Sequence, residues 1–123
     1  KLWWLDMSDL PGRRGSGAGQ VAYLLARVEA AQETAAALLV GFRDGLRLWA
    51  NGEVVYEGEH SGGMAAALVP VSLSRGTNTV LLKSCQAGSS LPGSWCLSVR
   101  WCRPDGTPAQ DVRGDGFAEL GGR

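Results

Sequence analysis

The chain has 123 residues, of which 45% are hydrophobic and 20% are charged, as in a single folded domain rather than a disordered or fibrous chain. Its twelve basic residues balance twelve acidic ones, so the cationic excess that binds nucleic acid or an anionic membrane is missing. No apolar run approaches the ~20 residues of a membrane-spanning helix. We therefore expect one soluble domain over residues 1–123, with no nucleic-acid partner and no membrane insertion.

Two patterns compete between Val21 and Phe42. Residues 29–39 are rich in Ala, Glu and Gln, which favour a helix, whereas the flanking residues 21–28 and 37–42 are typical of strands. The eighteen glycines and five prolines of the chain indicate many turns between short strands. We expect two strands here, turning near Ala31 to Thr34.

The dipeptide Asn51-Gly52 gives the strongest local signal, because both residues tolerate the positive φ of a type I′ hairpin turn. Regular pairing around this turn predicts one apolar face and one face that mixes aromatic and charged side chains. It sets three pairs opposite each other: Leu48 with Val55, Trp49 with Val54, and Arg47 with Tyr56.

A second hairpin is predicted from residues 79–85 and 95–102, joined by a turn-rich loop. Its buried face pairs Val80 with Trp101, Leu82 with Val99, and Ser84 with Leu97. Residues 68–73 form another expected strand, followed by a turn at residues 75–78. From residue 103 to 123 the chain has few apolar residues, which indicates turns and a loosely held tail.

Cys85 and Cys96 are opposite each other in this second hairpin. A disulfide between them would stabilise the fold by ~2–3 kcal/mol and would persist in an exported protein. The third cysteine, Cys102, favours the alternative that all three are buried thiols that pack as small hydrophobic residues.

Three stretches together resemble a known group of domains: residues 43–55 (RDGLRLWANGEVV), 69–83 (VPVSLSRGTNTVLLK) and 93–100 (GSWCLSVR). The order of an Asn-Gly hairpin, a Gly-x-Asn turn and a Gly-Trp strand start is similar to that of galactose-binding-like jelly-roll modules of bacterial glycoside hydrolases, especially the sugar-binding-like domain of family 2 enzymes. The similarity covers Val21 to about Gly106. It implies an all-β, antiparallel β-sandwich of the jelly-roll type.

The same resemblance implies a function. It favours a noncatalytic module of a larger exported bacterial protein, extracellular or periplasmic, that binds oligo- or polysaccharide and supports the neighbouring domains of the full-length chain. The alternative is a structural or protein-interaction module with no sugar ligand. One fold hosts many functions, so the site itself must decide.

The hairpin also resembles that of PA14-type domains, in which two successive Asp residues help to hold calcium. Here Arg43 replaces the first of them and leaves Asp44 alone, and a guanidinium would repel a divalent cation. We expect no metal at this hairpin, while a calcium site elsewhere in the chain stays open. We also expect no cofactor, and no catalysis: His60 is the only histidine, it belongs to no recognisable catalytic or zinc motif, and it is expected in a surface loop.

The predicted carbohydrate-binding residues are those near the mixed face of the first hairpin. A sugar packs its C–H face on an aromatic ring, and its hydroxyls pair with forked donors and carboxylates. The competing interpretation is that Trp49 is covered by the N-terminal segment that carries Trp3 and Trp4. The predicted set is Asp44, Arg47, Trp49, Tyr56 and Trp95.

Overall fold

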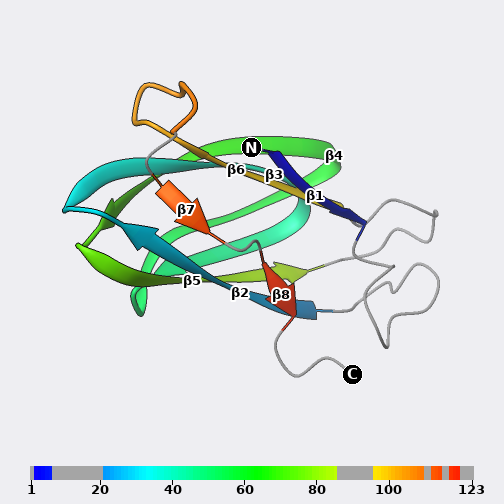
Figure 1. The fold of residues 1–123 in the computed structure, drawn as a ribbon. Helices are drawn as coiled ribbons and strands as arrows, with labels where there is room; N and C mark the ends of the chain where they lie inside the picture. Colours follow the sequence, from blue (N-terminus) through cyan, green and yellow to red (C-terminus); the bar gives the residue numbers. More distant parts are fainter. Residues whose placement is uncertain (1, 7–20, 86–95, 110–111, 115–116, 120–123) are drawn as a thin grey trace.

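The computed structural model describes residues 2–6, 21–85, 96–109, 112–114 and 117–119. Every element in these ranges is a β-strand, and every pairing is antiparallel (Figure 1). None of the described residues belongs to a helix that could span a membrane. The strands are β1 (Leu2–Asp6), β2 (Val21–Ala30), β3 (Thr34–Ala50), β4 (Glu53–Leu73), β5 (Gly76–Cys85), β6 (Cys96–Cys102), β7 (Val112–Gly114) and β8 (Ala118–Glu119).

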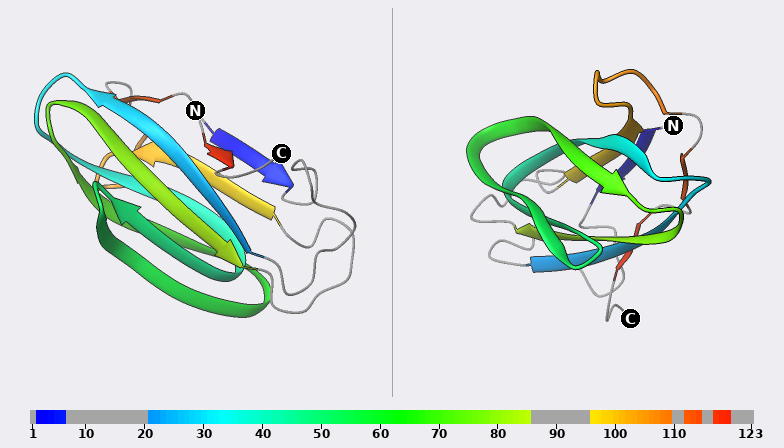
Figure 2. Two further views of the ribbon diagram at one scale, coloured as in Figure 1. Left: turned by 90° about the horizontal axis from the view of Figure 1, so that it is seen from below. Right: turned by 90° about the vertical axis from the view of Figure 1, so that its left-hand side faces the viewer.

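Two long strands, β3 and β4, take part in both layers of the molecule. Residues 37–42 of β3 pair with β6, and residues 45–50 pair with β5, while β4 follows β3 along nearly its whole length. The first layer therefore contains β1, β6 and the first part of β3 with the end of β4. The second layer contains β2 and β5, the rest of β3 and β4, and the short strands β7 and β8 on β2. Figure 2 shows the β3–β4 pair curving from one layer into the other.

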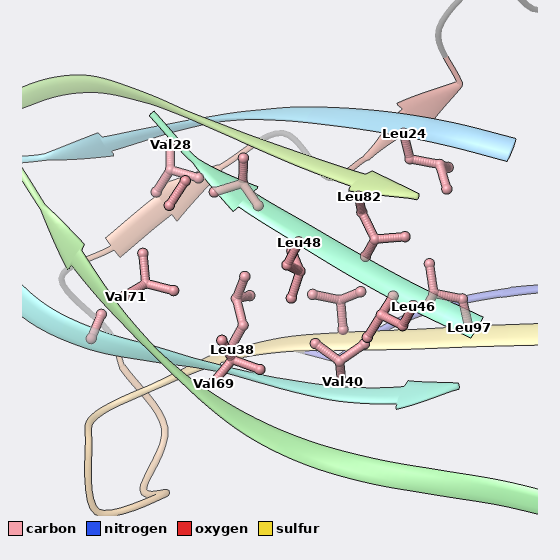
Figure 3. Close-up of a cluster of buried hydrophobic side chains, with 14 of the residues drawn as sticks. Leu24, Val28, Leu38, Val40, Leu46, Leu48, Val69, Val71, Leu82 and Leu97 are labelled. Carbon is pink, nitrogen blue, oxygen red and sulfur yellow. The ribbon is translucent and has the colours of Figure 1, made fainter. Parts of the chain in front are cut away.

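The core lies between the two layers. In β2 every even-numbered residue is buried and the odd-numbered ones are exposed or half-buried, so the strand turns one face inward. Leu24, Leu48 and Leu82 of the second layer point toward Leu38, Val40 and Val69 of the first (Figure 3). The predicted all-β, antiparallel β-sandwich is confirmed. The two strands expected between Val21 and Phe42 are confirmed as well, because burying this alternating face outweighs the helix propensity of residues 29–39.

The predicted hairpin of residues 79–85 with residues 95–102 is wrong. Strand β5 pairs with β2 and β3, and β6 pairs with β1 and β3. The buried faces were correctly assigned, since Val80, Leu82 and Leu97 are fully buried. These faces meet across the core from opposite layers instead of lying side by side in one sheet. An apolar stripe satisfies both arrangements equally, so the pattern did not distinguish them.

A buried amide fixes the turn between β4 and β5. Asn78 is 1% exposed, and its Oδ1 accepts a hydrogen bond of 2.9 Å from the Ser74 amide. Its Nδ2 donates to the carbonyl oxygens of Ser74 and Gly76, at 2.9 and 3.2 Å, and more weakly to that of Val28, at 3.4 Å. A buried polar side chain is stable only when its hydrogen bonds are made inside the protein, and Asn78 makes them to two backbone segments, the turn at residues 74–76 and Val28 of β2.

The same amide connects this turn to the Asn51-Gly52 turn. Asn51 Nδ2 donates to Asn78 Oδ1 at 2.9 Å, while Asn51 Oδ1 accepts from the Thr79 amide at 3.0 Å. The positive φ values of Asn51 (51°) and Gly52 (85°) are those of the predicted type I′ turn, which is confirmed. Two turns that are 27 residues apart in the sequence are thereby fixed at one end of the second layer.

Residues 103–109 form a defined turn after β6. Gly106, at φ 90°, donates its amide to the Arg103 carbonyl at 2.8 Å, and the Arg103 amide donates to the Thr107 carbonyl at 2.7 Å. Asp105 Oδ1 accepts hydrogen bonds from the Thr107 hydroxyl (2.7 Å) and amide (2.9 Å). These bonds lower the pKa of Asp105, the hydroxyl contributing most. Further on, β7 and β8 pair with β2, a pairing that composition did not indicate.

Replacing Asn78 tests the buried amide. We expect Asn78→Ala to lower the free energy of unfolding by about 2–3 kcal/mol, because it removes the part-buried hydrogen bonds to the Ser74 backbone and to Asn51 and leaves space where the buried side chain was. Asn78→Asp keeps the shape but removes the Nδ2 donor, so it should destabilise at least as much at neutral pH. Urea unfolding measures both, with the exposed Ser72→Ala as control; a loss below about 0.5 kcal/mol would contradict this role.

The Thr107 hydrogen bonds predict a pH effect. Because the pKa of Asp105 in the folded protein lies below its ordinary value of 3.8, its stabilising effect is present above pH 3.8 and is lost as the pH falls through the lower folded pKa. A carboxyl carbon NMR titration should give a midpoint below 3.8 that rises toward 3.8 in Thr107→Ala. A wild-type midpoint at or above 3.8 would refute the assignment.

Candidate functional site

A β-bulge follows the Asn51-Gly52 turn and changes the register of the first hairpin. Trp49 is opposite Val54, as predicted, but Leu48 is opposite Tyr56, so Val55 is an extra residue in β4. The predicted Leu48–Val55 and Arg47–Tyr56 pairs are therefore wrong. From this point Arg47 is opposite Glu57, and the residues of β4 up to His60 have moved by one position; a second register shift follows between Phe42 and Asp44.

The reason for the bulge is electrostatic. Leu46 faces the core and is 2% exposed, and regular pairing would place Glu57 opposite it, on the same buried face. Burying a carboxylate without a partner costs several kcal/mol. With the bulge, Gly58 is opposite Leu46 and the side chains of Glu57 and Glu59 are exposed. The extra residue thus keeps the Glu57 charge out of the core, although it interrupts the β3–β4 hydrogen bonding locally.

The outward face of the second layer then carries two adjacent rows of side chains, which we call the outer platform. Each row runs across β2, β5, β3 and β4 in register. The core residues between these positions point the other way, so the two rows share the solvent side. The charged row is Tyr23, Lys83, Arg47 and Glu57, and the apolar row is Leu25, Leu81, Trp49 and Val54.

Each cation of the outer platform lies near the face of an aromatic ring. The Arg47 guanidinium carbon lies 5.4 Å from the centroid of the Trp49 ring, and Lys83 Nζ lies 5.9 Å from that of Tyr23, both within cation–π range. Arg47 Nε is also 3.0 Å from Glu57 Oε2, but the N–H group is not directed at this oxygen. We regard the contact as an ion pair without a directed hydrogen bond, which fixes the position of the guanidinium rather than adding much stability.

The two aromatic rings of the outer platform are well separated. Tyr23 and Trp49 stand on β2 and β3, with β5 between them, and are two residues out of step. Strand spacing and rise place their Cα atoms on the order of 12 Å apart, further than a single sugar ring spans. The rings can thus contact different units of one extended ligand.

Asp44 lies at the corner where β3 leaves one layer for the other. Phe42 pairs with β6 and Gly45 with β5, and Asp44 between them has a φ of 60°, a left-handed conformation that Asp tolerates better than most residues. Asp44 is three residues from Arg47, about 10 Å along an extended strand. It positions the strand and lies away from the rings of the outer platform.

Of the five predicted site residues, the structure brings two into contact, Arg47 and Trp49. Tyr56 faces the interior, where its ring meets Phe42 edge-on at 6.1 Å and 70°. A Cβ on residue 58 would lie 2.5 Å from the Tyr56 hydroxyl, so Gly58 leaves room for this ring. The predicted placement of Tyr56 beside Arg47 is therefore wrong. Trp95 lies outside the described residues, and of Trp3 and Trp4 only the backbone, in β1, is described.

The cysteines do not follow the predicted pairing. Cys85 is opposite Gly45 and Val21, in a strand that does not pair with β6, and it is a free thiol. The predicted bridge to Cys96 is therefore not formed in this structure; of Cys96 itself, only the backbone is described. Cys102 is a buried free thiol.

Within the described residues, no group of three or more His, Cys, Asp or Glu side chains is placed to hold a metal ion. The backbone of His60 lies in β4, opposite Asp44. The loop predicted there is wrong, because β4 runs through this position as one strand, with a register shift against β3 between Phe42 and Asp44.

Sequence reasoning missed three polar or aromatic members of the outer platform. The residues concerned are Tyr23, Glu57 and Lys83. Alternation alone placed Leu81 and Lys83 on the solvent face, but the wrong partner strand separated them from Trp49. The strand pattern of residues 21–28 contains the signal for Tyr23, since it is in step with the outward residues Val21 and Leu25.

The position of Tyr56 leads to a stability test. We expect Tyr56→Ala to lower the free energy of unfolding by about 1–3 kcal/mol, because it removes a ring packed on Phe42. Tyr56→Phe keeps that ring and should stay within about 0.5 kcal/mol of the wild type. Thermal and urea unfolding distinguish the variants, and equal stability of Tyr56→Ala and wild type would contradict the packing.

Neither the scan against protein-family models nor the search of curated proteins gives a match to this chain. Among solved structures, the chain is similar to a PA14 sugar-binding domain from an RTX adhesin, with a TM-score of 0.50 and 16% sequence identity. The match covers 84% of this chain and 51% of that chain, so this chain spans about half of that neighbour's length. At this identity the likeness shows the fold alone, a β-sandwich, and the family 2 resemblance is not confirmed.

Proposed function

We propose that this chain is a carbohydrate-binding module and that the outer platform is its binding surface. The observation that carries the proposal is the Arg47–Trp49 pair on a solvent-facing sheet. An indole ring offers a flat apolar surface to the C–H face of a sugar, and a guanidinium offers a rigid fork of donors to its hydroxyls. The PA14-type neighbour, which is named as sugar-binding, supports the same interpretation.

The module would act by binding alone. In this role the side chains of the outer platform hold and orient a ligand and carry out no reaction. A single shallow surface binds weakly, so attachment to a larger exported protein would raise the effective concentration of its neighbouring domains on a polysaccharide. Repeated contact with one long ligand would supply the rest of the affinity.

A second candidate function is supported by the apolar row. Val54 is 48% exposed and stands in register with Trp49 and Leu81. A neighbouring domain could pack on these side chains, as in a structural or protein-interaction module without a sugar ligand. This candidate predicts no saturable binding to any glycan.

Removing the indole tests the carbohydrate proposal. Native affinity electrophoresis in gels containing soluble polysaccharides, followed by calorimetric titration of the retarding ones with matched oligosaccharides, should show saturable binding by the wild type. Trp49→Ala should weaken it about five- to thirtyfold, since stacking on an aromatic ring contributes on the order of 1–2 kcal/mol.

Leu68→Ala is the matched control, because Leu68 is an apolar side chain, 42% exposed, on the outward face of the first layer. It should leave binding unchanged, and thermal unfolding should show that both variants are folded. Equal binding by Trp49→Ala and wild type would refute the outer platform as the site. Absence of binding across a broad panel would refute the carbohydrate function and favour the packing surface.

A further inference from the structure

The centre of the outer platform carries two like charges side by side. Arg47 and Lys83 are directly opposite each other in the β3–β5 pair, an arrangement that is unfavourable unless something compensates it. Glu57 pairs with Arg47. Among the described residues, no carboxylate forms an ion pair with Lys83, and its ammonium group lies near the face of the Tyr23 ring. In the charged row of the outer platform, two positive charges therefore accompany the single carboxylate of Glu57, although the chain as a whole is neutral. Glu59, opposite Gly45 in the next row, is exposed on the same face.

Both cations have hydrogen-bonding capacity to spare. A guanidinium carries five N–H donors and an ammonium three, and the recorded contacts of Arg47 and Lys83 are one ion pair and two ring faces. A carboxylate placed between them would accept charge-assisted hydrogen bonds from both. It would also cancel the repulsion across the strand pair.

We propose that the outer platform selects acidic polysaccharides, with a uronate carboxylate between Lys83 and Arg47 and neighbouring sugar units against Trp49 and Tyr23. This inference rests on the proposed carbohydrate function. Lys83 is directly opposite Tyr23 in the β2–β5 pair, and Arg47 is two residues before Trp49 in β3. The two cations thus lie between the two rings, and a single extended chain reaches all four side chains. Charge complementarity thus distinguishes this ligand from a neutral glycan of the same shape.

Comparison of polygalacturonate with neutral galactan tests the charge, and calorimetric titration uses oligosaccharides of matched length from each. At low salt the wild type should bind the acidic ligand about three- to tenfold more tightly. Near 1 M salt, where the screening length is about 3 Å, this preference should disappear while binding to the neutral ligand persists.

Lys83→Met keeps the aliphatic stem and removes the charge. It should abolish the preference, because binding of the acidic ligand falls to the level of the neutral one. Arg75→Met is the matched control, because it removes one positive charge at the exposed turn between β4 and β5, and it should keep the preference. Thermal unfolding of both variants checks the fold, and polyglutamate serves as an anionic probe that has no sugar.

Each outcome separates this inference from the proposed function. Equal binding of acidic and neutral ligands by the wild type would overturn the acidic preference and leave the carbohydrate function standing. Equal loss of the preference in Lys83→Met and Arg75→Met would overturn it as well, since it would then reflect overall charge. Polyglutamate binding as tight as that of polygalacturonate would show that the surface recognises charge without sugar and would overturn the inference. Binding to neither glycan would also overturn the acidic preference, whereas the carbohydrate function itself is refuted only by absence of binding across the broad panel.

Discussion

The carboxylates of Glu57 and Glu59 determine how β4 lies against β3, and the outer platform depends on this register. In an uninterrupted hairpin both side chains would face the core beside Leu46, where an unpaired carboxylate is strongly unfavourable. The extra residue Val55 turns them to solvent and brings the Tyr56 ring inward against Phe42. The same shift brings Glu57 beside Arg47. Keeping the Glu57 carboxylate in solvent therefore also sets the position of the Arg47 guanidinium.

Two further constraints place this register within the sandwich. At Asp44 the β3 strand passes from the first layer to the second with its inward face preserved, as the burial of Phe42 and Leu46 on either side shows. At the far end of the second layer, Asn78 and Asn51 fix both turns by hydrogen bonds. Rigid strands fixed at both ends provide the kind of support that holds side chains such as Trp49 in place for a ligand.

Local patterns in the sequence sufficed for the central strands and for much of the core. Alternation identified the inward faces of residues 46–50 and 80–84, and the Asn51-Gly52 dipeptide indicated its turn, whereas β1, β7 and β8 were not predicted. What alternation does not contain is the choice of partner: the apolar faces of β5 and β6 suit a hairpin as well as two opposed layers, and only the three-dimensional path of β3 decides between them. The candidate site was therefore half predicted, because Arg47 and Trp49 share a strand, whereas Tyr23 and Lys83 join them through strands paired over long sequence distances.

The proposed ligand-binding surface is the solvent face of β2, β5 and β3, rather than the corner at Asp44 or the ends of the sandwich. Amide chemical-shift mapping by NMR during titration with a bound oligosaccharide tests it most directly. The account predicts that the largest perturbations follow residues 23–25, 47–49 and 81–83, three strands that meet only in the folded sheet. Perturbations concentrated at residues 43–45 and 60–64 instead, with this face unchanged, would contradict it.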